Sequence, residues 1–504
     1  MGIRRHLRHK LIALRLEVSL LAATMSAGAL AETISIAPST MRRIGTVDAR
    51  FQSYNVEMVE VTGGRFWRPY GPTIADEGGR SSHFAYRPPI DLSNPKLRQL
   101  ASALGPAYLR VSGTWANATY FADSDNAPSM SPSGFDGVLT RRQWHGVVDF
   151  ARAVDAKLVT SFAVSVGTRD ANGAWSADRA RRLIAYTNAI GGRIAAAEFI
   201  NEPDLAGLGG LPPHYDAGAY GRDMATFRAF ITRVDPSIKV LGPGLSGETA
   251  AAPDFLAAAG VGFDVFSYHH YDALSERCTG RADPETTLSE ERLARTDRAL
   301  AFQRALRDRF EPGRPIWLTE TAEAACGGDR WTATFRDTFR YLDQLGRLAK
   351  AGVQVVMHNT LAASDYGLLD EATLTPRPNY WGALLWRKLM GSTVLDAGVS
   401  REAGLHVYAH CLRDVAGGVA VLAINTDRRS AHALTLPDVS YRYTLDGLHL
   451  QDTTVRLNGE TLALNARDEL PAVDGVSTAA GLVTFAPATI TFLAMPAARN
   501  AACQ

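Results

Sequence analysis

From about residue 50 to residue 385, apolar positions follow two alternating patterns. Short β-branched runs, typical of buried strands, precede longer segments with apolar residues at helical period. The predicted strands are, in chain order, FQSYNVEM, AYLRVS, KLVTSFAV, AAEFINE, KVLGPGL, VFSYHHY, PIWLTE and VQVVMHNT. The clearest helices are NPKLRQLASAL, RRQWHGVVDFARAV, SADRARRLIAYTNAI, EERLARTDRALAFQRALRDRF and RDTFRYLDQLGRLAKAG. Eight strand–helix units in a row predict an α/β fold, a (β/α)8 TIM barrel over residues 49–388.

After about residue 390 the helical period disappears. Short runs such as VAVLAINT, YRYTLDGL, TTVRLNG and TITFLAM are separated by Gly, Asp and Asn turns. This pattern predicts an accessory all-β sandwich over residues 389–504. Residues 32–48 contain another strand-like segment, which we expect to add a strand to this sandwich.

The N-terminus has the composition of an export signal. MGIRRHLRHK is basic, and the apolar stretch VSLLAATMSAGALA ends in Ala-Leu-Ala. These features predict a signal peptide over residues 1–31, cleaved before Glu32, and a secreted or periplasmic protein. A disordered or membrane-anchoring N-terminus is the alternative. No later stretch of about 18 apolar residues follows, so we do not expect the mature form to span a membrane.

Charge and cysteine content narrow the class of protein further. The 504 residues carry a formal net charge of +1, without a long basic run or an acidic tail, so we expect no nucleic-acid partner and a monomer. Four cysteines (Cys278, Cys326, Cys411 and Cys503) allow two disulfides in three possible pairings. A zinc site is the alternative, but the C-x-x-C spacing is absent. We predict no cofactor and no metal.

Two glutamates end predicted barrel strands. Glu202, in EFINEPD, ends the fourth strand, and Pro203 stops it by removing a backbone donor. Glu320, in IWLTETAEAACGG, closes the seventh strand. These two strand ends lie at the barrel face that carries active sites, and they lie across its mouth. Two carboxylates flanking one bond are what glycoside hydrolysis requires, with a separation of roughly 5–5.5 Å in a retaining enzyme. Asn201, beside the acid, is expected to hold a sugar 2-hydroxyl.

Other polar residues have more than one interpretation. Glu198 shares strand parity with Glu202, so it either orients the catalytic groups or is a satisfied buried carboxylate. Asn55 and Glu57 on the first strand either contact sugar hydroxyls or fill the barrel interior. Arg110 is expected to be a structural cation for the buried acids.

Two further carboxylates are expected to lie outside the chemistry, and a pair of adjacent histidines is not expected to form a metal site. Asp204 and Glu323 are interpreted as loop charges or caps. His269 and His270 are adjacent on a predicted strand and should point to opposite faces, so they are not expected to share a metal ion.

Several long segments of the chain resemble one family. AEFINEP, WLTETAEAACGG, FSYHHY, NPKLRQLASALGPAYLR and SDYGLLDEATLTPRPNYWGALLWRKLMGSTVL resemble segments of glycoside hydrolase family 79, which holds heparanase and related β-glucuronidases. The resemblance covers nearly the whole mature chain. It implies a bacterial-type secreted member of that family.

The resemblance also implies residue roles. Glu202 matches the acid/base and Glu320 the nucleophile, while His270 or Tyr271 would line the site near that nucleophile. The resemblance assigns the glucuronate carboxylate to Tyr366 and to backbone N–H groups of Cys326, Gly327 and Gly328. Backbone donors bind an anion without placing a full positive charge beside the nucleophile.

The sequence departs from the family pattern at two places. Ala325 and Cys326 stand where the family has tyrosine and glycine, and Asp365 stands where heparanase has asparagine. A disulfide from Cys326 would pin the loop. The resemblance favours Cys411–Cys503, which match paired sandwich cysteines, and leaves Cys278–Cys326 as the second pair.

Together these features predict a retaining β-glucuronidase that acts by double displacement on glycans or glucuronides containing β-linked glucuronic acid. One alternative is an endo-β-glucuronidase acting on heparan sulfate or hyaluronan. The other is a non-catalytic glycan-binding protein, which would be expected to lack one of the two strand-end glutamates.

Overall fold

The computed structural model describes residues 34–70, 83–281, 283–399 and 404–504. The predicted signal peptide and its cleavage site lie outside the described residues. Residues 34–504 form one compact unit. Within the described part of the chain, no helix has the length and apolarity needed to cross a bilayer.

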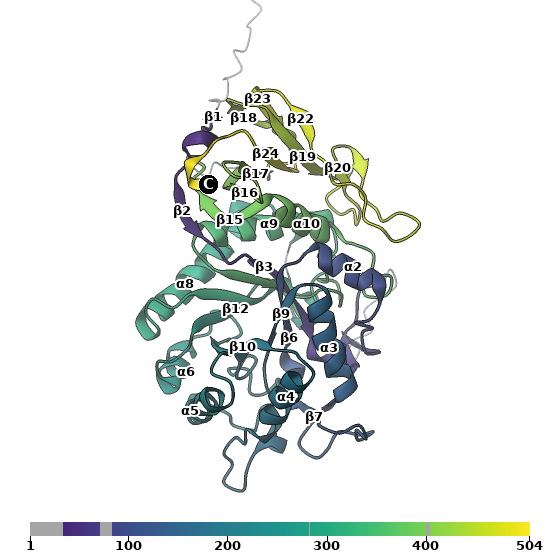
Figure 1. The fold of residues 1–504 in the computed structure, drawn as a ribbon, viewed down its shortest axis with the longest axis vertical. Coiled ribbons are helices and arrows are strands. Elements are labelled where there is room, and N and C mark those ends of the chain that lie inside the picture. The colour runs from purple at the N-terminus through teal and green to yellow at the C-terminus, as the bar shows by residue number, and fades with distance from the viewer. Residues whose placement is uncertain (1–33, 71–82, 282, 400–403) are drawn as a thin grey trace, which may run out of the picture. The chain divides into compact units, whose positions relative to one another are not determined.

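A closed parallel barrel forms the centre of the fold, which confirms the predicted (β/α)8 architecture (Figure 1). Its strands follow one another around the ring in chain order and match the eight predicted runs. They are β3 (Gln52–Glu57), β6 (Ala107–Ser112), β9 (Ala156–Thr160), β10 (Ile194–Glu198), β11 (Lys239–Pro243), β12 (Val265–Leu274), β13 (Ile316–Ala325) and β14 (Val355–His358).

Helices connect these strands. They are α1 (Met58–Thr62), α2 (Pro95–Ala103), α3 (Arg141–Ala153), α4 (Asp178–Ala189), α5 (Ala217–Val234), α6 (Ala252–Ala259), α7 (Glu290–Leu293), α8 (Arg295–Phe310), α9 (Phe335–Lys350) and α10 (Pro378–Leu389). The segment predicted as one helix over residues 290–310 is divided at Ala294 into α7 and α8. The β4 (Gly64–Trp67) and β5 (Phe84–Arg87) strands form a small antiparallel pair, while β7 (Thr119–Ala122) and β8 (Gly137–Thr140) form a parallel one.

Local sequence signals explain where two of the helices start. The Asn94 side chain caps α2 by accepting from the backbone N–H groups of Lys96 and Leu97, with Pro95 at the first helical position. Thr140 and Gln143 form a reciprocal capping box at the start of α3. These caps satisfy backbone donors that have no partner within the helix.

The C-terminal part forms two packed sheets. The larger sheet has the order β2-β15-β16-β17-β24-β19-β20-β21, with β22 also paired to β19, and the smaller one has the order β1-β18-β23. The N-terminal strands β1 (Ile34–Ser35) and β2 (Arg43–Thr46) thus join these sheets. The remaining strands are β15 (Met390–Leu395), β16 (Leu405–Leu412), β17 (Val419–Asn425), β18 (His432–Leu436), β19 (Ser440–Asp446), β20 (Arg456–Leu457), β21 (Glu460–Thr461), β22 (Val476–Thr478), β23 (Gly481–Phe485) and β24 (Thr489–Met495).

Strand β17 shows that the two faces of the larger sheet pack into two different apolar cores. Val419, Val421 and Ala423 pack between the two sheets. Ala420, Leu422 and Ile424 point the other way, into the core that contains the barrel helices. Because successive side chains alternate between faces, one apolar strand buries both sets. The β-domain therefore shares a continuous apolar core with the barrel.

A buried polar network joins α9 to this sheet. Asp343 on α9 lies 2.7 Å from His406 Nδ1 and accepts from the Tyr408 hydroxyl at 2.6 Å, both on β16. Arg347 donates to the other Asp343 oxygen at 2.5 Å. The charged residues of the buried helix α9 are thus paired where it meets the β-domain.

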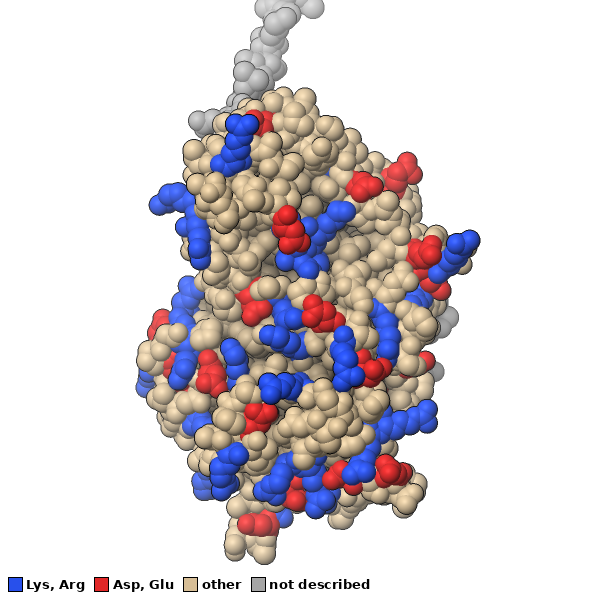
Figure 2. All heavy atoms as spheres, viewed as in Figure 1, with Lys and Arg blue, Asp and Glu red and all other residues tan. Residues whose placement is uncertain are grey.

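The exposed charges are mixed in sign. On the face shown in Figure 2, blue Lys and Arg side chains alternate with red Asp and Glu side chains over both the barrel and the β-domain. The distribution matches the net charge of +1.

Candidate active site

Glu202 and Glu320 reach the same region from two strands. Strand β10 ends at Glu198, and Glu202 lies four residues beyond it, in a left-handed conformation with φ 49°. Its backbone N–H donates to Gly244 O just after β11. Such a conformation costs a non-glycine residue roughly 1–3 kcal/mol, and it is often found at functional sites. The prediction that both glutamates end their strands is wrong: β10 stops before Glu202, and β13 continues past Glu320 to Ala325.

His269 on β12 bridges the two glutamates. Its Nδ1 lies 3.0 Å from Glu202 Oε1 and 3.7 Å from Glu320 Oε2. The nearest ligand-type atoms of the three residues all lie within 4.8 Å of one another. This spacing is closer to the separation of roughly 5–5.5 Å between carboxyl groups in a retaining glycosidase than to the roughly 6.5–9.5 Å of an inverting one.

Arg110 lies within β6, contacts this group and is fully buried. Its Nη1 donates to Glu320 Oε2 at 2.9 Å, and Nε donates to Glu198 Oε2 at 2.9 Å. Its Nη2 donates to Asn201 Oδ1 at 2.7 Å. Thr319 Oγ1 donates to the other oxygen of Glu198 at 2.7 Å. Glu198 is therefore a buried, paired carboxylate next to the candidate catalytic pair, and Arg110 is the cation that compensates it.

The electrostatic environment separates the two candidate catalytic glutamates. Burial raises the pKa of Glu202, and repulsion from Glu320 adds to this, against the hydrogen bond with His269. Burial would also raise the pKa of Glu320, but the charges of His269 and Arg110 and the Tyr271 hydrogen bond together lower it. The surroundings thus favour a protonated Glu202 and an ionised Glu320.

The same environment makes His269 a cation. Burial alone would lower its pKa, yet Glu320, Glu198 and Glu202 together raise the pKa of His269 to about 10. Arg110 and His269 offset the charges of Glu198 and Glu320. In the same way, Arg110 and His269 overcome burial and lower the pKa of Glu198.

Tyr271 begins a hydrogen-bond chain that leads away from Glu320. Its hydroxyl donates to Glu320 Oε1 at 2.6 Å and accepts from Asn359 Nδ2 at 2.9 Å. Asn359 Nδ2 also lies 3.0 Å from Glu57 Oε1 and 3.4 Å from the Tyr366 hydroxyl. The sequence-predicted residues Glu57, Tyr271 and Tyr366 are therefore brought together by Asn359.

Asn55 and Glu57 lie inside the barrel beside this chain. Asn55 Nδ2 donates to Thr319 O at 3.1 Å and to Asn359 Oδ1 at 3.0 Å. Burial and the charge of Glu320 raise the pKa of Glu57 well above its ordinary value, although Arg110 opposes the shift. The second oxygen of Glu57 and the amide oxygen of Asn55 have no hydrogen-bond partner in the described part of the chain.

Strand parity places two predicted residues elsewhere. His270 points away from Glu320 toward the helices, where burial and nearby arginines, against Asp272, lower its pKa to about 4. The position we expected for it is occupied by His269, which is in register with Glu320. Glu323 is not in a loop: it lies in β13, and it pairs with Arg292 at 3.0 Å and Thr332 at 2.6 Å. Adjacent or odd-spaced strand residues face opposite ways, which explains why His270 and Glu323 both point away from the site. Glu323 is in a strand because β13 extends to Ala325. Asp204 is a loop cap, because it accepts from the Ser246 backbone and hydroxyl.

The loop Cys326–Gly328 follows β13 with three successive positive φ angles. Its carbonyl groups are all occupied: those of Cys326 and Gly328 accept from Arg277, and that of Gly327 accepts from the Ser364 hydroxyl and the Asp365 N–H. The N–H groups of the loop donate no hydrogen bond to any described residue. A Cβ on Gly327 would lie 2.6 Å from Ser364 Oγ, so glycine is needed there.

Both predicted disulfides are confirmed. Cys278 pairs with Cys326, and Cys411 on β16 pairs with Cys503 at the C-terminus. In the described residues no cysteine is free.

A metal ion is a poor fit to the candidate site. Glu202, His269 and Glu320 have suitable spacing, but the charged Arg110 side chain lies 2.9 Å from Glu320. His269 has a pKa raised to about 10 and would need to lose its proton to bind a metal.

Comparison with known proteins assigns the family. Residues 87–346 match the N-terminal domain of glycosyl hydrolase family 79. The chain belongs to this family. It is 25% identical to heparanase-like protein 3 of Arabidopsis thaliana, over 90% of this chain and 91% of that protein. It is also 28% identical to mouse heparanase, over 82% of this chain and 88% of that protein. As a member of family 79, the protein is a glycoside hydrolase.

Solved structures show the same fold. A 4-O-α-L-rhamnosyl-β-D-glucuronidase from Fusarium oxysporum matches with a TM-score of 0.63 at 14% identity, over 92% of this chain and 99% of that chain. At this identity the likeness supports the barrel with its accessory β-domain, not the substrate.

Two members of the site were missed by sequence reasoning in this family 79 protein. His269 could have been found from parity, because Tyr271 two residues later faces Glu320. Asn359 carried no comparable signal: it follows β14, and only the fold brings it between Glu57 and Tyr271.

Proposed function

We propose that the protein is a retaining β-glucuronidase that removes β-linked glucuronic acid from glycans or glucuronides. The proposal is carried by one observation: Glu202 and Glu320 lie close enough for direct displacement, and their surroundings move their pKa values in opposite directions. Family membership and the relatives named heparanase support the choice of an acidic sugar.

In the proposed mechanism, ionised Glu320 attacks the anomeric carbon while protonated Glu202 donates to the leaving oxygen. A covalent glucuronyl–enzyme forms, and Glu202 then removes a proton from the attacking water. Arg110 and Tyr271 hold the two oxygens of Glu320 and keep it ionised. His269 holds Glu202 beside the reacting bond.

We assign sugar contacts to the surrounding polar groups. Arg110 occupies the amide oxygen of Asn201, so the NH2 end remains for the 2-hydroxyl. The unpartnered oxygens of Asn55 and Glu57 are suited to other hydroxyls. Tyr366 and the free N–H groups of Gly327 and Gly328 are assigned to the glucuronate carboxylate. We assign His270 no contact with the sugar.

The decisive experiment uses a mechanism-based fluoro-glucuronide. Incubation with the wild-type protein should add one glucuronyl group, which peptide mass spectrometry should locate on Glu320. Glu320→Gln should show no adduct. A wild-type protein without an adduct and without hydrolysis of an aryl β-glucuronide would support a glycan-binding protein instead.

Analysis of the released sugars distinguishes exo from endo action. We expect monosaccharide glucuronate from an aryl β-glucuronide and from heparan sulfate, hyaluronan and glucuronoxylan fragments. Release of oligosaccharides alone would establish the endo alternative.

We also propose that the protein acts as an exported monomer of the bacterial type; its N-terminal composition and its two disulfides support export.

A further inference from the structure

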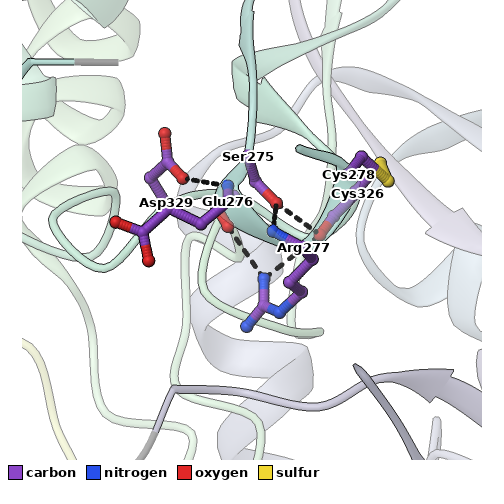
Figure 3. The surroundings of a disulfide bond; sticks show 7 residues. Ser275, Glu276, Arg277, Cys278, Cys326 and Asp329 are labelled. Atoms are coloured by element: carbon purple, nitrogen blue, oxygen red, sulfur yellow. Dashed lines mark hydrogen bonds between the residues drawn. A yellow bond between two sulfur atoms is a disulfide. The ribbon is translucent and has the colours of Figure 1, made fainter. Parts of the chain in front are cut away.

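The two departures from the family pattern, Cys326 and Asp365, meet at one side chain. Arg277 lies in the turn after β12, next to Cys278 and close to Cys326 (Figure 3), and is 7% exposed. Its Nη1 donates to the carbonyl oxygens of Cys326 at 3.1 Å and Gly328 at 2.8 Å. Its Nη2 donates to Asp365 Oδ2 at 2.5 Å and to the carbonyl of Arg68 at 2.5 Å.

The neighbouring Cys278 forms the disulfide with Cys326. The turn after β12 is therefore linked to the Cys326–Gly328 loop both by a covalent bond and by hydrogen bonds. Ser275 strengthens this turn: its hydroxyl accepts from the Arg277 backbone at 3.1 Å and lies 3.4 Å from Cys326 O. Asp329, just beyond the loop, accepts from the Glu276 backbone at 2.9 Å.

Arg277 also fixes a third segment. Its guanidinium lies 3.7 Å from the centre of the Tyr70 ring, and Arg330 lies 4.6 Å from the same ring centre. The Tyr70 backbone N–H donates to both oxygens of Asp365. The carboxylate of Asp365 thus both neutralises Arg277 and ties Tyr70 to the loop after β14.

This arrangement decides which way the loop N–H groups point. In a planar trans peptide, the C=O and N–H groups point in opposite directions. The carbonyl of Cys326 points to Arg277, so the N–H of Gly327 points away from it. The carbonyl of Gly327 points to Ser364 and Asp365, so the N–H of Gly328 points away from them.

The loop is also connected to the catalytic region. Asp365, which accepts from Arg277, precedes Tyr366, and Tyr366 packs with Ala322 and Tyr271. Tyr271 in turn donates to the nucleophile Glu320. A shift of the loop would therefore change the groups that face the sugar rather than a distant surface.

We propose that Arg277, Asp365 and the Cys278–Cys326 disulfide form a clamp that holds the Gly327 and Gly328 N–H groups in the orientation that binds the sugar carboxylate, and so sets the preference for an acidic over a neutral sugar. Arg277 is a positioning residue, because its charge is paired with Asp365 and its N–H groups donate to backbone carbonyls. The inference rests on the proposed function, since it deepens the recognition of glucuronate at that site.

The test compares two ligands that differ only at the carboxyl group. Calorimetry on the full chain gives the Kd of D-glucuronate and of its neutral amide, D-glucuronamide, and their ratio measures the acid preference. The clamp variants are Cys278→Ala and Arg277→Lys; the lysine keeps the charge but lacks the planar fork of five donors that reaches these acceptors together. The matched control is Cys411→Ala/Cys503→Ala, which removes the other disulfide.

We expect both clamp variants to reduce the acid preference by about 10-fold or more, the size of one lost hydrogen bond to a charged group. For an aryl β-glucuronide, the clamp variants should raise KM more than they lower kcat. The control should keep the wild-type ratio. Clamp variants that fold and keep the ratio within about twofold would overturn the proposal, as would an equal loss in the control.

Reduction provides the same comparison without a substitution. If Cys278→Ala does not fold, wild-type protein is treated with a thiol reductant, and alkylation with mass analysis identifies the opened disulfide. Loss of acid preference should follow opening of Cys278–Cys326, and an unchanged ratio would overturn the proposal. A wild-type protein that prefers glucuronate but does not hydrolyse an aryl β-glucuronide would contradict the proposed function alone, whereas one that binds both ligands equally would contradict the clamp.

Discussion

Arg110 donates to Glu320 at 2.9 Å from a fully buried position, and the same guanidinium holds Glu198 and Asn201. The proposed nucleophile is therefore not an isolated carboxylate at a strand end. Its ionised state depends on a cation that is shared with a second buried acid.

Replacing Arg110 should damage both activity and stability. Arg110→Met leaves Glu198 and Glu320 buried with only His269 to offset their charges, so we expect kcat/KM to fall at least about 100-fold. The free energy of unfolding should fall by about 3–5 kcal/mol, the usual cost of breaking a buried ion pair. Steady-state kinetics and denaturant unfolding measure these effects, with Arg110→Lys as the milder variant. Near-normal turnover in Arg110→Met would show that Glu320 does not depend on Arg110.

The pH profile should respond to His269 in a defined direction. The wild-type profile should be bell-shaped, with activity lost at low pH as Glu320 gains a proton and at high pH as Glu202 loses its proton. His269 lowers the pKa of both glutamates, so His269→Gln should move both limbs to higher pH. The measurement is kcat/KM against pH. The control is His270→Gln, which changes the side chain on the other face of β12 and should leave both limbs in place. Limbs that stay fixed or move to lower pH in His269→Gln would contradict the assignment.

If Glu202 is the general acid, the rate loss caused by replacing it should depend on the leaving group. Glu202→Gln should lose about 100-fold to 10,000-fold in rate with a poor alcohol leaving group, because general acid catalysis contributes that much. The formation of the covalent intermediate should be nearly retained with a dinitrophenyl leaving group, which needs no proton. Pre-steady-state release of dinitrophenol measures this step. Glu320→Gln should be inactive with both substrates, and equal losses for both leaving groups in Glu202→Gln would remove it from the acid role.

Asp343 should affect stability without affecting the chemistry. It joins α9 to His406 and Tyr408 on β16, and Asp343→Asn should lower the free energy of unfolding at neutral pH by about 2–4 kcal/mol while kcat/KM is retained. Burial opposes it, but His406 and Arg347 lower the pKa of Asp343 in the folded protein. Its contribution is therefore present above the unfolded pKa of about 3.9 and is lost as pH falls toward the folded pKa.

Denaturant unfolding at a series of pH values checks this sign. The gap between wild type and Asp343→Asn should close as the solution becomes acidic. Asp149→Asn, in a partly exposed pair with Arg98, is the matched control and should change stability by about 1 kcal/mol or less. A gap that widens toward acid would show that Asp343 is not the group responsible.

The sequence alone determined the barrel, and it singled out two candidate catalytic residues. Apolar β-branched runs specify strands, and their alternation with helical periods allows few arrangements other than a closed parallel barrel. Since carboxyl ends of such strands meet at one face, Glu202 and Glu320 could be paired across 118 positions of sequence.

Only the tertiary structure decided how these groups are tuned. Strand register places His269, not His270, beside Glu320, and Asn359 reaches Glu57 only because β14 closes against β3. Arg277 likewise has its ion-pair partner, Asp365, 88 residues later in the sequence. Hydrogen bonds and pKa shifts act over a few ångströms between residues remote in sequence, so no local pattern records them, whereas strand periodicity is local and can be read directly.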